Sequence, residues 1–252
     1  MLALYGEPLS PGVTEHFLKK SDAERALKTA QKLAAHDISE WAIAGGWAVE
    51  IHCILNRQKP FLRHLMDIDF VVPSFDSIPR TLAESFLFRH VHPADPPGKM
   101  LLQFVDVETA LRIDVFRACG GTMSRTHITG LPTEPMRLVA REDVVARTAR
   151  LLLDVDVNIP VPEKHARDYV RISEGVPPAN LEAAWEDHRK LDHPCAFREA
   201  DQLVRKLIST REKLLITPEY STNTRDVCPR CVPNAPFLLA DPAEILSVLG
   251  YC

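Results

Sequence analysis

Hydrophobic and polar positions follow two different periods along the chain, and each period predicts a different kind of element. Short apolar runs rich in Ile, Val, Leu and Phe, some carrying acids at every second position, are typical of strands. Apolar residues that recur at intervals of three and four predict helices packed on a core. The first part of the chain shows both patterns, with strands expected at 41–44, 67–72, 100–107 and 111–116 and helices at 21–36, 47–55 and 78–86.

From about residue 138 the helical period takes over. Helices are expected at 141–154, 162–172, 181–191, 197–215 and 241–251, around a Pro-rich irregular stretch at 218–236. A mixed pattern followed by a helical one predicts an α/β (α+β) fold. We expect a mixed sheet flanked by helices in residues 1–137 and a mostly helical C-terminal domain with a Pro-rich tail in residues 138–252.

The pattern of candidate chemistry begins where the first predicted strand ends in Gly45 and Gly46. The second predicted strand carries Asp67 and Asp69, and residues two apart on a strand point to the same face. Two adjacent carboxylates suit a hard divalent cation, above all Mg²⁺. The glycines lack side chains, so backbone N–H groups at the start of the next helix can approach a polyphosphate.

A third acid lies in the predicted strand 111–116, read as LRIDVF. The alternation places Asp114 on one face together with Arg112. An acid inside an otherwise apolar strand is costly to bury unless it serves a purpose. Asp114 is therefore a candidate functional residue.

Taken together, the Gly-Gly pair, the Asp-x-Asp strand and the later acid resemble the nucleotidyltransferases of the DNA polymerase beta superfamily, over about residues 20–172. The variant is similar to the antibiotic (aminoglycoside and lincosamide) enzymes and to the abortive-infection toxin type. The resemblance implies transfer of a nucleoside monophosphate from a nucleoside triphosphate such as ATP to a hydroxyl group. Asp67 and Asp69 would hold the metal that carries the triphosphate. Asp114 would help to bind a second Mg²⁺ or take the proton from the acceptor.

The same resemblance implies that Gly45 and Gly46 cradle the β- and γ-phosphates, with Arg63 and Lys164 as supporting charges. Lys164 belongs to a Lys-x-x-x-Asp pattern that ends at Asp168. The acceptor stays open: a small-molecule hydroxyl, as in antibiotic resistance, or a tRNA end or protein side chain, as in toxin–antitoxin systems.

Two other functions compete with this interpretation. One is a catalytically degenerate domain of the same fold that binds a nucleotide or a partner. The other is an interaction protein with a zinc-bound tail, because Cys228 and Cys231 have the spacing of half a zinc site. A second Asp-x-Asp, at Asp154 and Asp156, lacks an upstream glycine pair and is expected to form a turn.

Composition narrows the class of protein. The chain has 252 residues, of which 46% are apolar and 25% charged, as in ordinary globular proteins. Its net charge of −4 argues against a dedicated nucleic-acid binder, which usually carries a basic excess. No apolar run reaches membrane-spanning length, so no membrane partner is expected. Six cysteines do not make a disulfide scaffold, which predicts a reduced, cytoplasmic protein.

Overall fold

A seven-stranded mixed sheet forms the centre of the protein, with strand order β3-β4-β5-β2-β1-β7-β6. The computed structural model describes residues 12–92, 101–130, 135–154, 161–210 and 214–215. Strands β2 and β5 pair in parallel, as do β1 and β7, and the other neighbours are antiparallel. The strands are β1 (Ala42–Ile43), β2 (Asp67–Val72), β3 (Leu87–His92), β4 (Leu101–Asp106), β5 (Leu111–Arg117), β6 (His127–Gly130) and β7 (Pro135–Leu138).

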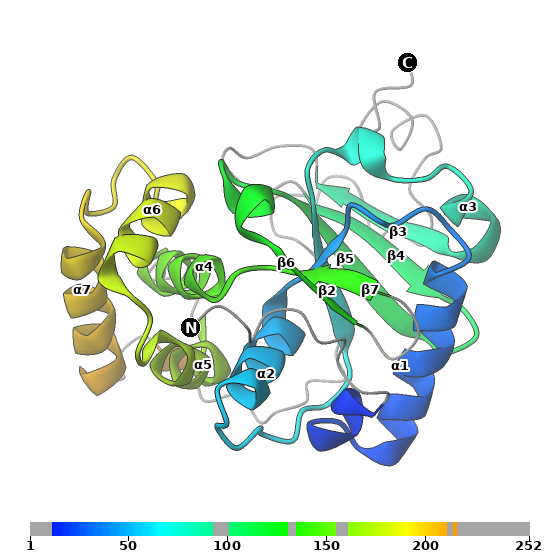
Figure 1. Ribbon diagram of the computed structural model, residues 1–252, viewed down its shortest axis with the longest axis horizontal. Coiled ribbons are helices and arrows are strands. Elements are labelled where there is room, and N and C mark those ends of the chain that lie inside the picture. The colour runs from blue at the N-terminus through cyan, green and yellow to red at the C-terminus, as the bar shows by residue number, and fades with distance from the viewer. Residues whose placement is uncertain (1–11, 93–100, 131–134, 155–160, 211–213, 216–252) are drawn as a thin grey trace.

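Helices α4 to α7 lie together at one end of the sheet, next to α2 (Figure 1). The α-helices are α1 (Lys20–Leu33), α2 (Gly45–Leu55), α3 (Leu82–Ser85), α4 (Arg141–Leu153), α5 (Glu163–Ser173), α6 (Pro178–His188) and α7 (Phe197–Thr210). The described part also contains three 3-10 turns, η1 (Val13–His16), η2 (Phe75–Ser77) and η3 (Thr122–Arg125). A short parallel pair is formed by β8 (Val161–Pro162) and β9 (Leu214–Leu215). This confirms the mixed α+β class, while the domain boundary at residue 138 stays a prediction.

One hydrophobic core joins the sheet to the helices. Trp41 and Phe70, on neighbouring chain segments of the sheet, are fully buried with ring centroids 5.3 Å apart. Tyr169 and Trp185 of the helical part belong to the same buried cluster. Because apolar burial is continuous across both parts, side chains on α4 and α5 are held in fixed positions relative to the sheet.

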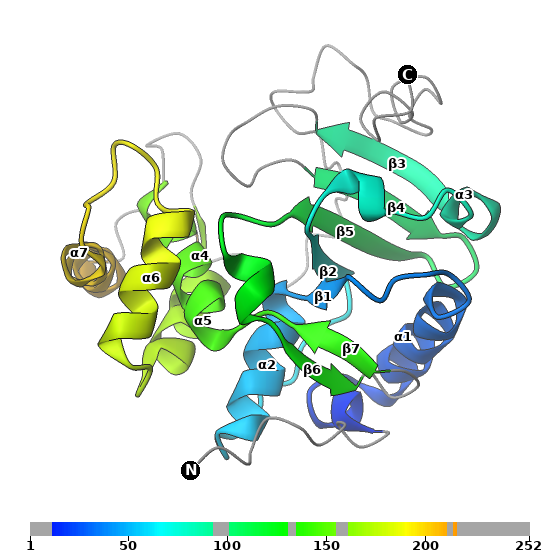
Figure 2. The ribbon, with the colours of Figure 1, turned by 45° about the horizontal axis from the view of Figure 1, so that its top comes forward.

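Several elements differ from the sequence-based prediction. The helix expected at 78–86 is a single turn, and the turn expected to begin at residue 90 is instead the end of β3. Strands β6 and β7 were not predicted. They exist because β7 pairs with β1, a long-range contact that local pattern does not encode (Figure 2). The helix expected at 197–215 ends at residue 210, and the segments 218–236 and 241–251 lie outside the described residues.

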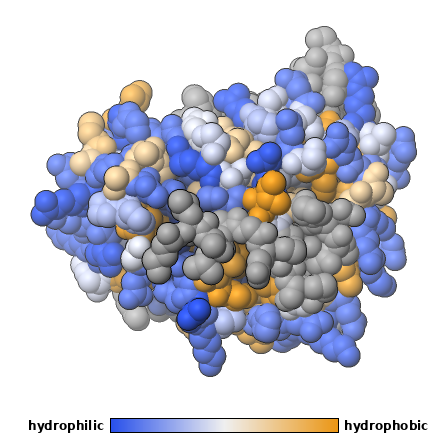
Figure 3. Space-filling view, viewed as in Figure 1, coloured by the Kyte–Doolittle hydropathy of each residue, from blue (hydrophilic) through white to orange (hydrophobic). Residues whose placement is uncertain are grey.

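The face shown in Figure 3 is mostly hydrophilic, with a hydrophobic area near its middle. Within the described ranges, none of the helices is both long and apolar enough to cross a membrane.

Candidate functional site

Gly45 forms the turn between β1 and α2, and its conformation leaves room for a carboxylate. Its φ of +57° lies in the left-handed region that favours glycine. A Cβ atom built on Gly45 would lie 1.7 Å from Oδ2 of Asp69. The backbone N–H of Ala44 donates to the carbonyl of Asp69 at 2.9 Å, which fixes the turn against β2. The glycine is therefore required for the acid of β2 to lie against the start of α2.

Gly46 has a similar relation to a cation. A Cβ atom on Gly46 would lie 2.9 Å from Nη1 of Arg63, so this guanidinium packs against the glycine backbone. The two predicted glycines thus make space for charged side chains. Their contact with phosphate stays a prediction.

The parallel pairing of β2 with β5 brings the three predicted acids together. Asp69 is the direct neighbour of Asp114, and Asp67 is the neighbour of Arg112. The Arg112 guanidinium donates to Asp67 through Nη2, and its Nε lies 3.0 Å from Oδ1 of Asp114. The predicted sharing of one face by Arg112 and Asp114 is therefore observed, with the cation between two of the acids.

Two of the three acids, Asp69 and Asp114, lie in surroundings that disfavour their charged form. Burial raises the pKa of the Asp69 carboxyl, and the charge of Asp67 raises it further. Burial also raises the pKa of Asp114 to about 8; the charge of Arg112 opposes this effect, and repulsion from Asp69 and Asp67 adds to it. Among the described residues, Oδ1 of Asp114 is a buried oxygen that accepts no hydrogen bond of ordinary geometry. Such a cluster would be stabilised by an added cation.

The donor set fits a divalent cation in its chemistry, because all three groups are hard oxygen ligands. Asp67, Asp69 and Asp114 would hold the ion. As the structure stands, no group of three or more His, Cys, Asp or Glu side chains within the described segments is already arranged around a metal position. Arg112 occupies contacts of Asp67 and Asp114, so a cation would have to take over those contacts.

The predicted cation Arg63 lies beside the acids but is bound by two other carboxylates. Its Nε donates to Glu50 at 2.7 Å and its Nη2 to Asp168 at 2.6 Å. Glu50 is completely buried and also accepts two hydrogen bonds from Arg171, at 2.8 and 2.9 Å. Burial by itself would raise the pKa of Glu50, but the hydrogen bond from Arg171 and the charge of Arg63 lower it. The sequence analysis did not single out Glu50, although a lone acid in a mostly apolar helix is a usable signal.

A cavity of about 1100 Å³ lies between the sheet and helices α4 and α5. The predicted residues that line it are Gly45, Gly46, Arg63, Asp67, Asp69 and Lys164. Asp114 is not among the lining residues, and its side chain is only 7% exposed.

Two cations of the helical part face the acids across this cavity. Lys164 is exposed on α5, and its positive charge acts on Asp69. Arg147, on α4, packs its guanidinium 4.0 Å from the ring centre of Phe116. Burial lowers the pKa of Arg147, and attraction to Asp69 opposes that effect. Sequence analysis missed Arg147, because the side of α4 that faces the cavity depends on tertiary packing.

The two other metal patterns fall mostly outside the described residues. Asp154 is held by Lys190 and His193, which lower its pKa to about 2 against the opposing effect of burial. Asp156 and both cysteines of the proposed zinc half-site, Cys228 and Cys231, lie outside the described residues.

No family model matches the sequence, and no curated protein matches it. Two solved structures from Helicobacter pylori resemble the fold. JHP933 has a TM-score of 0.38 and 11% identity, over 77% of this chain and 96% of that one. A protein described as "putative nucleotidyltransferase" has a TM-score of 0.30 and 12% identity, over 77% of this chain and 99% of that one. Both TM-scores are too low to identify a family, so the function has to be argued from the chain's own residues.

Proposed function

We propose that the chain is a Mg²⁺-dependent nucleotidyltransferase that transfers a nucleoside monophosphate from a nucleoside triphosphate, such as ATP, to a hydroxyl acceptor. One observation carries this proposal. The carboxylate of Asp69 lies against the glycine turn, and Asp67 and Asp69 line the same 1100 Å³ cavity as Arg147 and Lys164. Carboxylates that suit a metal cation and positively charged side chains that suit phosphate thus line one cavity, which is large enough for a nucleotide.

In this proposal, Asp67, Asp69 and Asp114 would hold two Mg²⁺ ions. Bound Mg²⁺ would supply positive charge to the phosphate oxygens as pyrophosphate leaves. The protein has to hold the acceptor hydroxyl, the α-phosphorus and the leaving group in line.

The cationic side of the cavity would bind the triphosphate. Arg147 and Lys164 would pair with its oxygens, and the first N–H groups of α2, at Gly45 and Gly46, would donate to it. Arg63 would contribute mainly by ordering this turn, since Glu50 and Asp168 already occupy its donors.

Asp114 is suited to accept the proton of the acceptor hydroxyl. Burial and neighbouring acids raise its pKa, and a base whose pKa is close to the working pH transfers protons most effectively. Its place beside Asp69 in the sheet register puts it next to the proposed metal-binding pair. The acceptor itself would be a small molecule, a tRNA end or a protein side chain.

A second candidate function is a degenerate domain that binds a nucleotide or a partner without catalysis. It is favoured by one observation, the ion pairs of Arg112 with Asp67 and Asp114, which occupy the contacts a cation would need.

Labelled transfer separates the two functions. The full chain is incubated with each α-phosphorus-labelled triphosphate, Mg²⁺ and a cell extract, with Asp69→Asn as the matched variant. We expect a labelled acceptor with the wild type and none with Asp69→Asn. Triphosphate binding without any labelled acceptor would favour the degenerate domain, and the absence of both binding and label would reject both functions.

A further inference from the structure

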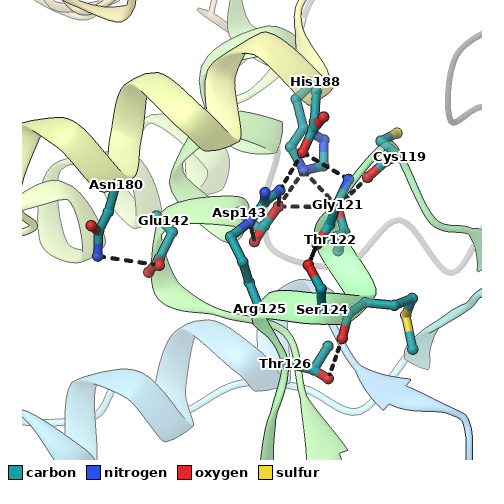
Figure 4. Close-up of polar contacts among 12 residues, drawn as sticks. Cys119, Gly121, Thr122, Ser124, Arg125, Thr126, Glu142, Asp143, Asn180 and His188 are labelled. Atoms are coloured by element: carbon teal, nitrogen blue, oxygen red, sulfur yellow. Dashed lines mark hydrogen bonds and ion pairs between the residues drawn. The ribbon is translucent and has the colours of Figure 1, made fainter.

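A second cluster of reactive side chains also lines the cavity, and Figure 4 shows the polar contacts within it. Cys119 and Thr122 follow β5, Asp143 lies in the first turn of α4, and His188 ends α6. All four line the cavity, although Cys119 is only 7% exposed. The proposed nucleotidyl transfer uses none of them.

The acid of this cluster is fixed in place. Asp143 is completely buried, and its carboxylate accepts hydrogen bonds from Arg125 Nε at 2.8 Å and Arg125 Nη2 at 2.7 Å. The hydroxyl of Thr122 donates to Oδ1 of Asp143 at 3.0 Å. Arg125 is further held by Asp187 at 2.6 Å. The carboxylate therefore has one orientation and stays ionised, because these partners lower its pKa against the effect of burial.

The acid in turn orients an imidazole. Nε2 of His188 lies 3.0 Å from Oδ1 of Asp143, and it must be the donor because an ionised carboxylate only accepts. His188 is 4% exposed, and its other nitrogen, Nδ1, is buried without a hydrogen-bond partner of ordinary geometry among the described residues. A buried polar nitrogen without a partner is costly, and it indicates a position held ready to take up a proton.

The nearby proton donor is a thiol. Burial by itself would lower the pKa of His188, but the hydrogen bond to Asp143 and the interaction with Cys119 raise it. Burial alone would raise the pKa of the Cys119 thiol, but the interaction with His188 and the charges of Arg147 and Arg150 lower it. An acid, an imidazole oriented by it and a thiol are the usual parts of an activated nucleophile.

The other cysteines of the described residues provide a contrast. Cys53 is buried in the core, and burial raises the pKa of its thiol despite the charge of Arg171. Cys195 is exposed. Among these three cysteines, only Cys119 combines a partner imidazole with a position on the cavity wall.

We propose that Cys119 is a reactive thiol site, activated by His188 and Asp143, that exchanges with low-molecular-weight disulfides entering the cavity. The Cys119 sulfur attacks one sulfur of the disulfide, and the disulfide's S–S bond breaks as the new S–S bond forms. The thiol proton passes to the imidazole of His188 and from there to the departing thiolate. One disulfide and one protein thiol thus give one mixed disulfide and one small thiol, so no further oxidant is needed.

The test is site-resolved labelling of the native full chain. Iodoacetamide and, separately, oxidised glutathione are added, and the rate of modification of each cysteine is measured by peptide mass spectrometry. We expect Cys119 to react faster than the exposed Cys195 and much faster than Cys53. We expect His188→Gln to lower the modification rate of Cys119 by at least about tenfold and to leave that of Cys195 unchanged, because the imidazole promotes formation of the Cys119 thiolate. His36→Gln, a histidine of the surface that bonds Thr81 and Ser85, is the matched control.

A measurement on the wild type keeps the test decisive if His188→Gln does not fold. Lowering the pH by one unit should reduce the modification rate of an ordinary thiol such as Cys195 by about tenfold, and should reduce the modification rate of Cys119 by less. Cys119 reacting no faster than Cys195, an equal loss of rate at the lower pH, or a mixed disulfide on Cys195 and none on Cys119 would each overturn the proposal. None of these measurements depends on nucleotidyl transfer.

Discussion

Removal of the Glu50 carboxylate should be severely destabilising. Glu50 has no exposed side-chain surface, and the side chains of Arg63 and Arg171 that it binds are only 13% and 12% exposed. It also accepts the backbone N–H of Phe61 at 2.9 Å. Glu50→Ala would leave two largely buried cations with fewer partners, and breaking buried pairs in this way costs about 3–5 kcal/mol. That is a large part of the stability of a typical domain.

The assay is urea and thermal unfolding followed by fluorescence of the three buried tryptophans, which lie in both the sheet and the helical part. For a protein of this size the expected loss corresponds to a fall of about 6–20 °C in Tm. Glu186→Ala is the control: its ion pair with Arg189 is on the surface, with Glu186 66% exposed, and it should change stability little. If Glu50→Ala were no more destabilising than this control, Glu50 would not organise the region between α2 and α5.

Three further predictions concern the site. Gly45→Ala should lower the free energy of unfolding by about 1–2 kcal/mol for its left-handed backbone alone, and by more because the new Cβ collides with Asp69. Combining it with Asp69→Gly should recover part of this loss. If the stability changes of the two single variants simply add in the double variant, the contact is contradicted. Folding raises the pKa of Asp114 above its usual 3.8, so the native state keeps a proton that the unfolded chain releases, and wild-type stability falls as the pH rises above that value. Asp114→Asn should flatten this decline in urea unfolding measured across pH. An unchanged pH profile would refute the assignment of the decline to Asp114. Arg147→Ala should weaken triphosphate binding, measured by calorimetry, about tenfold or more, whereas the control Arg198→Ala, at an exposed position, should leave it unchanged. Equal affinities of the two variants would remove Arg147 from the site.

The acids and glycines could be predicted from the sequence because their signals are local. Period-two spacing places Asp67 and Asp69 on one face, and a Gly pair after a strand indicates a special turn. The reason for Gly45 could not be predicted, since its close contact is with Asp69 on another strand. The ion pairs of Arg112 likewise depend on the parallel register of β2 and β5, which no local pattern encodes.

Residues contributed by the helical part were harder to predict. Arg147 lies in a helix whose orientation is set by packing against the sheet and the other helices. Cys119 and His188 are far apart in the sequence and line the same cavity only because η3 contacts α4 and α6. Strand β7 has the same origin, since it forms by pairing with β1. Glu50 is different, because a lone acid in an apolar helix is visible in the sequence.

The most direct test of the central claim is calorimetric binding of a non-hydrolysable triphosphate with and without Mg²⁺. It compares the wild type, Asp69→Asn and the exposed control Asp76→Asn. If Asp67 and Asp69 hold the metal that carries the triphosphate, the wild type and Asp76→Asn bind it tightly only with Mg²⁺. Asp69→Asn then loses about tenfold or more in affinity. Equal affinity of all three proteins, or wild-type binding that is indifferent to Mg²⁺, would contradict the claim.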